Sequence, residues 1–400
     1  MGIKVAKTAN EAFAEGMRQI NPDVVAAYPI TPATEIVQIF SQFVADGLVE
    51  TEFIPVESEH SAMSACIGAS AAGARTMTGT SSQGLAFMWE MLYIASGLRL
   101  PIIMAVVNRT LSSPINIHCD HSDTFGARDS GWIQIYSENV QETYDNLIQA
   151  VRIAEHPDVL LPIMVMTDGF ILSHCLETME MLTDQEVCDF VGKPPIRPNL
   201  IKSAIEGKPI TIGALDLPDY YFEHKRQQAE GMKNALKVIP EIGKEFGDKF
   251  GRYYGFVENY KLDDADIGIV VIGSTAGTAK EVVDNLRKKG IKAGLLKIRV
   301  LRPLPVSDIK NSLKNLKVVG VMDRVEGMNG FCGPLYSEIS AILYDLEKKP
   351  ILTNFVYGLG GRDVKIEDIE SIFNELLEIL EKGKKEFTLK YIGVREDGHR

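Results

Sequence analysis

The chain has 400 residues, a formal net charge of −12 and a hydrophobic fraction of 45%, an ordinary globular composition at a length that allows two or three domains. The negative charge argues against nucleic acid or an anionic membrane surface as the partner, because both attract concentrated positive charge. No apolar stretch reaches membrane-spanning length and the N-terminus lacks a signal-peptide core, so we expect a cytoplasmic protein with no membrane partner.

The cysteines are odd in number and scattered, and no two of them form a C-x-x-C pair. They are Cys66, Cys119, Cys175, Cys188 and Cys332. This usage fits a reducing cytoplasm. It also excludes an iron–sulfur or zinc-ribbon site built by this chain alone.

Strand and helix signals alternate along the first 190 residues. Phe13, Met17 and Ile20 are spaced i, i+4, i+7 and predict an opening helix. The further elements that we expect, in chain order, are a strand over 24–28, a helix over 34–44, a strand over 52–56, a helix rich in small residues after it, a strand over 75–80, a long buried helix over 81–98, a strand over 101–109, a polar loop over 110–131, a strand over 132–136, a helix over 140–156 and a strand over 159–169. Because strand 101–109 is apolar along its whole length, we expect a parallel sheet with helices on both faces.

Proline clusters and dense charge distinguish residues 191–260, which we interpret as an irregular inter-domain segment with a helix near 225–245. From Asp266 the strict alternation returns and predicts a second, smaller α/β domain over 261–400. Its expected strands are 267–274, 293–301, 317–323 and 351–359, and its expected helices are 278–290, 307–316, 334–346 and 366–383. Gly290 is the expected C-cap of the first of these helices.

The stretch AAYPITPATEI (26–36) places Thr31 between Pro29 and Pro32, where a strand gives way to a helix. Proline fixes φ and restricts the residue before it, so this corner is stiff. One interpretation is a plain turn in which Thr31 or Thr34 is the N-cap of the following helix. The other is that the corner holds the Thr31 hydroxyl at a site.

Arg109 ends the most apolar strand of the sequence. It is either salt-bridged within the protein or placed at the carboxyl edge of the sheet, where open α/β sheets bind ligands. In the second case its planar guanidinium suits a carboxylate, since it can bond both oxygens.

Glu59 follows strand 52–56, at the start of a helix of small residues. The plain interpretation is a capping or dipole partner of that helix. Glu57 is a rival for any functional role. Gly68, nine residues after Glu59 in a helix crowded with alanine, separates the two through the family resemblance described below.

Two further stretches suggest ligands less strongly. CDHSD (119–123) could ligate a metal ion, but local Asx turns explain loop aspartates equally well, and we predict no metal ligand in this chain. GSTAGTAKE (273–281) could hold a phosphate at a helix start. It is not G-x-G-x-x-G and no acidic residue follows at the required spacing, so a plain helix start is the favoured interpretation.

Taken together, these motifs resemble the alpha subunits of multi-subunit 2-oxoacid:ferredoxin oxidoreductases, most closely the pyruvate type. The segments that carry the resemblance, in the family's order, are YPITP (28–32), SEHSAMSACIGASAAGA (58–74), TSSQGL (80–85), NRTLSSPINIHCDHSD (108–123), ARDSGWIQ (127–134) and DGFILSH (168–174). Residues 266–400, including LRPLP, are similar to the transketolase C-terminal domain. The resemblance covers nearly the whole chain and is weakest across 190–260.

The resemblance implies a pyrimidine-type thiamine-diphosphate-binding domain over 1–190, followed after the inter-domain segment by a transketolase C-terminal-like domain. This family binds thiamine diphosphate between two α/β domains, one of which grips the diphosphate through Mg²⁺ with a G-D-G motif. The sequence has no G-D-G. The expected partners are therefore a beta subunit with the diphosphate and Mg²⁺ site, a gamma subunit and a ferredoxin-like delta subunit. The [4Fe-4S] clusters are expected in partner subunits and not in this chain.

The resemblance also assigns site residues. Glu59 takes the position of the glutamate that hydrogen-bonds pyrimidine N1′, and its family spacing to Gly68 selects it over Glu57. Thr31 and Arg109 match the positions that bind the 2-oxoacid, the arginine through the carboxylate and the threonine through its hydroxyl. Cys119 departs from the family, since many relatives have glycine there; if that position needs positive φ, the loop must differ locally.

The implied activity is CoA-dependent oxidative decarboxylation of a 2-oxoacid, with pyruvate as the favoured substrate, to acyl-CoA and CO₂, with electrons passed to ferredoxin. Branched-chain 2-oxoacids and 2-oxoglutarate remain alternatives. So does the beta subunit of a lipoate-dependent 2-oxoacid dehydrogenase, against which the YPITP corner and the DHSD loop argue. A non-catalytic scaffold is a third interpretation, against which the intact set of Thr31, Glu59 and Arg109 counts.

Overall fold

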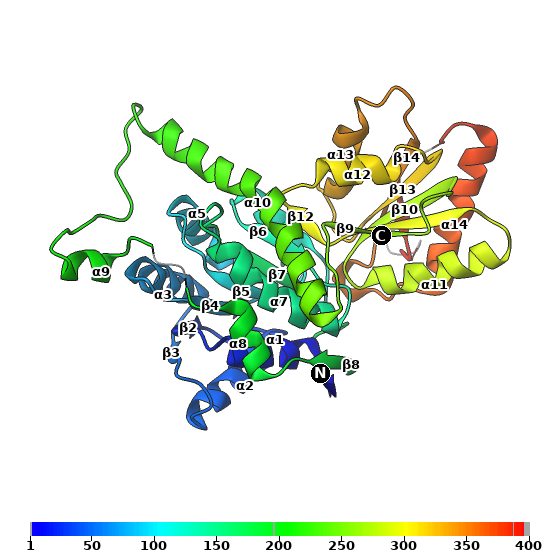
Figure 1. Ribbon diagram of the computed structural model, residues 1–400. Coiled ribbons are helices and arrows are strands. Elements are labelled where there is room, and N and C mark those ends of the chain that lie inside the picture. Colours follow the sequence, from blue (N-terminus) through cyan, green and yellow to red (C-terminus); the bar gives the residue numbers. More distant parts are fainter. Residues whose placement is uncertain (1, 195–196, 387, 396–400) are drawn as a thin grey trace.

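The computed structural model describes residues 2–194, 197–386 and 388–395. Its strands form a seven-stranded sheet, a six-stranded sheet and a two-stranded sheet. We call the seven-stranded sheet with its helices the first unit and the six-stranded sheet with its helices the second unit; they lie side by side (Figure 1). Within the described residues, no helix combines the length and apolar character needed to cross a bilayer.

The first unit is a parallel sheet with one antiparallel edge strand. Its order is β12-β6-β7-β5-β4-β2-β3, and β12 pairs antiparallel with β6. The strands are β2 (Val24–Ala27), β3 (Glu52–Pro55), β4 (Thr76–Thr80), β5 (Ile103–Asn108), β6 (Ile133–Tyr136), β7 (Ile163–Asp168) and β12 (Val300–Arg302). The helices are α1 (Ala9–Ile20), α2 (Thr34–Ala45), α3 (Glu59–Ala72), α4 (Ser82–Phe87), α5 (Trp89–Gly97), α6 (Ser122–Gly126), α7 (Val140–Glu155) and α8 (Asp184–Val191), with a 3₁₀ turn η1 (Ala127–Asp129). A separate antiparallel pair joins β1 (Ile3–Lys7) to β8 (Glu177–Met181).

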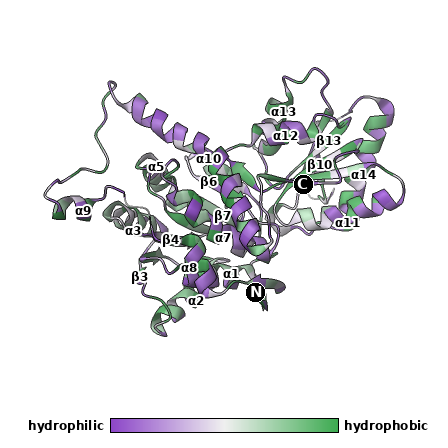
Figure 2. Cartoon of the chain, viewed as in Figure 1, coloured by the Kyte–Doolittle hydropathy of each residue, from purple (hydrophilic) through white to green (hydrophobic). Residues whose placement is uncertain are grey.

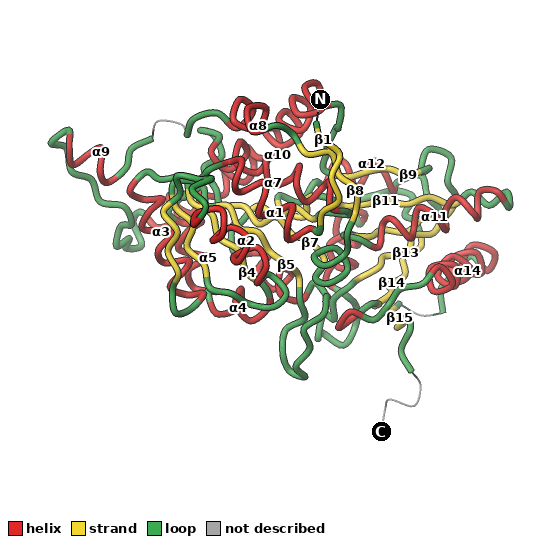
Figure 3. The backbone as a smooth tube through the Cα atoms, turned by 90° about the horizontal axis from the view of Figure 1, so that it is seen from below, coloured by secondary structure: helices red, strands yellow, loops and turns green. Residues whose placement is uncertain are grey.

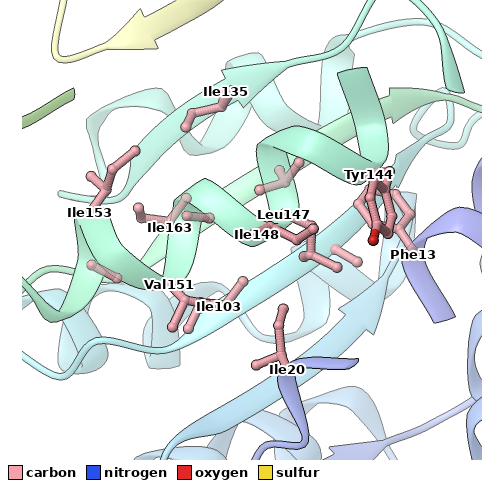
Figure 4. Close-up of a cluster of buried hydrophobic side chains, with 14 of the residues drawn as sticks. Phe13, Ile20, Ile103, Ile135, Tyr144, Leu147, Ile148, Val151, Ile153 and Ile163 are labelled. Carbon is pink, nitrogen blue, oxygen red and sulfur yellow. The ribbon is translucent and has the colours of Figure 1, made fainter. Parts of the chain in front are cut away.

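Both faces of this sheet are covered, as the continuous apolar strands predicted. Along β5, Ile103 and Ala105 face the core beneath α7, while Met104 and Val106 face the core on the other side. Figure 4 shows the first of these cores, with side chains of α7 packed over strand residues such as Ile103. Alternate residues of β5 thus belong to two different cores, and for this reason the strand is apolar along its whole length.

The second unit is also an α/β layer structure, with strand order β15-β14-β13-β10-β11-β9. Its strands are β9 (Val257–Tyr260), β10 (Ile267–Ile272), β11 (Ala293–Ile298), β13 (Val318–Asp323), β14 (Ile351–Tyr357) and β15 (Leu389–Ile392). Helices α11 (Thr275–Lys288) and α14 (Ile366–Lys382) cover one face (Figure 3), and α12 (Val306–Leu313) and α13 (Pro334–Leu343) belong to the core on the other.

One hydrophobic core joins the two units. Leu92 and Met104 of the first unit belong to the same buried cluster as Val270 and Leu296 of the second. The second unit also supplies β12 to the edge of the first sheet, next to β6. The two units are thus held together by packing as well as by polar contacts, which matters for the site between them.

The structure corrects four details of the predicted elements. The long buried helix over 81–98 is two helices that meet at Met88, and its large side chains Phe87, Trp89, Tyr93 and Ile94 are exposed rather than buried. Neither Thr31 nor Thr34 caps α2, whose N-cap is Ala33 without a side-chain bond. Helix α11 has its C-cap at Lys289, one residue before Gly290, which follows with φ of 82°.

The fourth correction concerns the inter-domain segment. It holds a short helix α9 (Leu200–Ile205) and a 30-residue helix α10 (Tyr221–Phe250), longer than the predicted 225–245. The buried residues of α10 lie in its C-terminal part, from Gly231 onward, and its hydrophilic N-terminal part projects from the sheet (Figure 2). Helical propensity of a polar, charged stretch explains the extension. Pro195 and Ile196, within the proline cluster, lie outside the described residues.

Candidate functional site

Arg109 lies directly after β5, at the carboxyl edge of the first sheet, which is the second of the two positions that the sequence left open. Arg109 is only 8% exposed. Nε donates to the carbonyl oxygen of Asn116 (3.1 Å) and Nη1 to that of Thr31 (2.9 Å). Among the described residues, Nη2 has no hydrogen-bond partner and the guanidinium forms no ion pair, so the salt-bridge interpretation does not hold. Burial lowers the pKa of Arg109, while the nearby Asp123 raises it, and an arginine remains a cation at neutral pH.

Thr31 meets Arg109 through its backbone rather than its side chain. The residue is exposed at the turn before α2. Neighbouring elements hold this turn in place: Asn10 Nδ2 donates to the Pro32 carbonyl oxygen (2.8 Å), and a Cβ on Gly169 would lie 3.0 Å from Pro32 Cγ. The corner is therefore fixed by packing, as its two prolines suggested. The Thr31 hydroxyl makes no hydrogen bond to the described chain.

Glu59 and Glu57 occupy different environments, although they are two residues apart. Glu57 is exposed and accepts a hydrogen bond from the Ser61 hydroxyl, which lowers its pKa. Glu59, the first residue of α3, is 7% exposed. A Cβ on Gly84 would lie 2.7 Å from its Oε1 and 2.5 Å from Thr80 Oγ1, so only glycine at position 84 leaves room for the carboxylate. Burial separates the two glutamates independently of Gly68, which faces open space.

Asp123 links the elements that carry these residues. Its Oδ2 accepts from the backbone N–H of Arg109 (3.0 Å) and of Ser82 (3.1 Å), and Ser82 begins the helix that contains Gly84. Its Oδ1 accepts from Asn108 Nδ2 (2.8 Å) and the Thr124 N–H (2.8 Å). Along one edge of the sheet, Asp123 thus bonds to Arg109, which contacts Thr31, and to the helix whose Gly84 lies beside Glu59.

Sequence reasoning missed this role of Asp123, which we considered only as a loop aspartate or a metal ligand. The available signal was an aspartate that follows a buried strand end within fifteen residues. Burial raises the pKa of Asp123 to about 6, against its backbone and amide hydrogen bonds, which lower it. At neutral pH the group is a carboxylate that accepts four N–H bonds.

We predict that Asp123→Asn lowers the free energy of unfolding by about 2–3 kcal/mol. Both carboxylate oxygens of Asp123 accept from N–H donors, so the NH₂ group of asparagine would face two of these donors in either orientation of the amide and leave them without an acceptor. Calorimetric unfolding of the assembled complex should show a lower midpoint. Asp120→Asn is the matched control: Asp120 Oδ1 accepts from the Ser122 N–H and hydroxyl, and an amide oxygen preserves both bonds. Equal midpoints for the two variants would contradict the role of Asp123.

The polar stretch 110–131 is not a loop throughout, because it contains α6 and η1. It runs between the first unit and the second. Its Cys119 carbonyl oxygen accepts from the Gly361 N–H (2.7 Å), and the His121 N–H donates to the Arg324 carbonyl oxygen (2.8 Å). Cys119 does not take positive φ, so its side chain needs no local change of the loop. A cleft of about 750 Å³ opens between this stretch and the second unit, with Asn116 and Arg128 in its wall.

A buried polar cluster lies beneath this stretch. Asp168 lies at the end of β7. It forms a hydrogen bond with His121 Nε2 (2.8 Å) and an ion pair with Arg324 of the second unit (3.2 Å). Burial raises the pKa of Asp168, but His121 and Arg324 outweigh it and hold the pKa below its ordinary value. Cys119, His121 and Asp168 place ligand atoms within 4.8 Å of one another. The Arg324 cation beside them disfavours a metal ion at this position.

The stretch GSTAGTAKE also contacts Asp168. The Ser274 N–H (3.0 Å) and hydroxyl (2.5 Å) both donate to Asp168 Oδ2. The start of α11 thus binds the carboxylate of Asp168 from the first unit. The sequence had left a phosphate as the alternative ligand for this helix start. This agrees with the favoured interpretation of a plain helix start.

Comparisons with known proteins agree with this architecture. Residues 15–244 match the family described as "Pyruvate flavodoxin/ferredoxin oxidoreductase, thiamine diP-bdg", and residues 265–369 match "Pyruvate:ferredoxin oxidoreductase core domain II". The chain is 54% identical to pyruvate synthase subunit PorA of Thermotoga maritima over 98% of each chain. It is 43% identical to ketoisovalerate oxidoreductase subunit VorA of Pyrococcus abyssi, also over 98% of each.

Two solved structures share the fold. One is the 2-oxoglutarate:ferredoxin oxidoreductase of Magnetococcus marinus with 2-oxoglutarate, coenzyme A and succinyl-CoA bound, at 22% identity and a TM-score of 0.70 over 94% of this chain and 65% of that chain. The other is a split-gene transketolase, described as an inactive beta4 tetramer, at 12% identity and a TM-score of 0.54 over 94% of this chain and 99% of that chain. These two structures support the transketolase-like fold, whereas the thiamine-diphosphate-binding domain is supported by the family match over residues 15–244.

Proposed function

The chain belongs to the family of alpha subunits of multi-subunit 2-oxoacid:ferredoxin oxidoreductases, and we propose that its substrate is pyruvate, which the complex converts with coenzyme A to acetyl-CoA and CO₂ while electrons pass to ferredoxin. The observation that carries the proposal is Arg109. The residue is 8% exposed, its guanidinium forms no ion pair among the described residues, and the nearby carboxylate of Asp123 accepts its backbone N–H instead. Such a cation is costly to bury unless an anion joins it.

A 2-oxoacid carboxylate suits this position. Two carbonyl oxygens, of Asn116 and Thr31, orient the guanidinium, and Nη2 is left for a ligand. Two parallel N–H···O bonds from an arginine give both affinity and direction to a carboxylate. The exposed Thr31 hydroxyl, on the corner that Arg109 contacts, adds a second donor toward the substrate.

The thiamine diphosphate expected of this family fits the surroundings of Glu59. The carboxylate is buried, Gly84 leaves room for it, and the Thr80 hydroxyl, which lies at the same glycine, is buried without a hydrogen-bond partner among the described residues; the hydroxyl of the next residue, Ser81, is likewise buried and unpartnered. Such orphaned groups call for a polar ligand. We propose that Glu59 holds the pyrimidine ring of the cofactor by a hydrogen bond to its ring nitrogen.

The work of this chain is then to bind and orient. When bound, the thiazolium of the cofactor supplies the nucleophilic carbon for decarboxylation. Glu59 provides a fixed negative charge that favours the protonated ring nitrogen. Arg109 and Thr31 fix the carboxylate end of the substrate, which limits the reacting carbon to one approach.

Other subunits complete the enzyme in this proposal. The sequence has no G-D-G motif and no cysteine set for a cluster, so the diphosphate and Mg²⁺ site belongs to a beta subunit. The [4Fe-4S] clusters belong to partner subunits, and a gamma subunit and a ferredoxin-like delta subunit complete the assembly.

Steady-state rates of the native complex with a panel of 2-oxoacids test the proposal, using coenzyme A, a viologen acceptor and no lipoyl protein. We expect the highest kcat/KM with pyruvate. The VorA relatives make a branched-chain 2-oxoacid the second candidate, and a higher kcat/KM with 2-oxoisovalerate or 2-oxoglutarate would overturn the assignment of pyruvate. Absence of CoA-dependent viologen reduction would overturn the enzyme class.

A further inference from the structure

Asn116 connects Arg109 to the second unit. Its carbonyl oxygen accepts from Arg109 Nε (3.1 Å), and its side-chain Nδ2 donates to the carbonyl oxygen of Gly360 (2.9 Å). Its Oδ1 accepts from the His118 N–H (2.7 Å). Asn116 is therefore held by these three hydrogen bonds. Among the described residues, it is the only one that accepts a hydrogen bond from the Arg109 guanidinium and also bonds to the second unit.

The second unit meets this residue with a glycine turn, residues 358–361. Gly358, Gly360 and Gly361 all have positive φ, of 63°, 62° and 75°. A Cβ on Gly360 would lie 2.5 Å from Asn116 Nδ2, and a Cβ on Gly361 would overlap His118. The turn thus depends on glycine for two reasons, its backbone conformation and its close approach to the stretch 110–131.

We propose that Asn116 is a positioning residue for substrate binding. Its bond to the glycine turn of the second unit fixes its own carbonyl oxygen, and that oxygen orients the guanidinium of Arg109. This inference rests on the proposed function, because it assigns Asn116 an effect on the substrate carboxylate only through Arg109. It gives the second unit a part in substrate binding, although the predicted site residues all lie in the first unit.

The physical reason is pre-organisation. A free arginine side chain loses several rotatable bonds when it binds a carboxylate, and that loss weakens binding. Carbonyl oxygens from two different elements, Thr31 at Nη1 and Asn116 at Nε, fix the plane of the fork before the substrate arrives. If the Asn116 carbonyl is no longer held in place, one of these two constraints is lost.

A double-mutant cycle on the holoenzyme complex tests this. Asn116→Ala removes the bond to Gly360 and is expected to raise KM for the 2-oxoacid about five-fold with little change in kcat, as for the loss of one modest interaction. KM for coenzyme A should not change. The same variant in an Arg109→Ala background should cause no further loss of kcat/KM, because Asn116 acts through Arg109.

Gly360→Ala is the second variant, and it keeps the test decisive if Asn116→Ala does not fold. Its methyl group displaces Asn116 Nδ2 and should reproduce the rise in KM. Gly383→Ala is the matched control, since Gly383 has φ of 66° in the same unit and open space around it. It carries the same backbone strain and should leave KM unchanged.

The outcomes separate the two proposals. If Arg109→Ala leaves KM and kcat/KM for the 2-oxoacid unchanged, the proposed role of Arg109 in substrate binding fails and this inference with it. If Arg109→Ala impairs substrate use but both Asn116→Ala and Gly360→Ala leave KM as in the wild type, only the inference fails. Additive losses in the double variant would also overturn it, since Asn116 would then act independently of Arg109.

Discussion

Glu59→Gln is expected to lower kcat of the assembled complex about 10²–10³-fold, the usual effect of removing one well-placed electrostatic group. Glutamine has nearly the shape of glutamate, so the space beside Gly84 stays filled. What is lost is the negative charge that, in the proposed function, faces the pyrimidine ring nitrogen. Steady-state turnover with saturating pyruvate, coenzyme A and viologen measures the change.

Glu57→Gln is the control for this prediction. It makes the same chemical change two residues earlier, on an exposed side chain whose partner is the Ser61 hydroxyl. We expect turnover within about two-fold of the wild type, since surface substitutions of this kind have small effects. Similar losses in both variants, or near-normal turnover of Glu59→Gln, would contradict the role of Glu59.

Much of the first unit could be predicted because local sequence determines it. A strand such as β5, apolar on both faces, has a pattern typical of a covered parallel sheet. The strand end then places Arg109 at the edge where ligands bind. The break at Met88 could not be predicted in this way: Phe87, Trp89 and Tyr93 indicate a buried helix by composition, yet the structure leaves them exposed.

Long-range contacts explain what was missed in the site. Asp123 connects Ser82 and Arg109, and nothing in the sequence around it specifies those partners. Likewise Asp168 meets Ser274 and Arg324, more than a hundred residues away. Motifs within one segment reveal residue types, whereas the pairing of segments depends on the packing of the two units.

The joint core has a consequence for the site. Because buried side chains of both units form one cluster, a shift of the second unit would disturb packing as well as the contacts of stretch 110–131. Close-packed interiors resist such shifts. The second unit therefore offers a rigid support to the edge of the first sheet that carries Arg109, which is what the proposed binding of a carboxylate requires of that arginine.

Arg109→Ala is expected to lower kcat/KM for the 2-oxoacid about 10²–10³-fold, chiefly through KM, because the carboxylate loses its charged partner. Arg109→Lys should recover only part of this loss. Lysine keeps the charge but cannot bond the carbonyl oxygens of Thr31 and Asn116 while it presents a planar fork to the substrate. Rates over a range of pyruvate concentrations measure both effects.

Arg226→Ala is the control, since Arg226 lies exposed on α10 and pairs with Glu230 one helical turn later. Its kcat/KM should equal that of the wild type. Near-normal kcat/KM in Arg109→Ala would show that the buried guanidinium serves the fold alone. The partial recovery with lysine distinguishes these cases, because a purely structural cation held by two carbonyl oxygens would affect stability and leave KM for the 2-oxoacid unchanged.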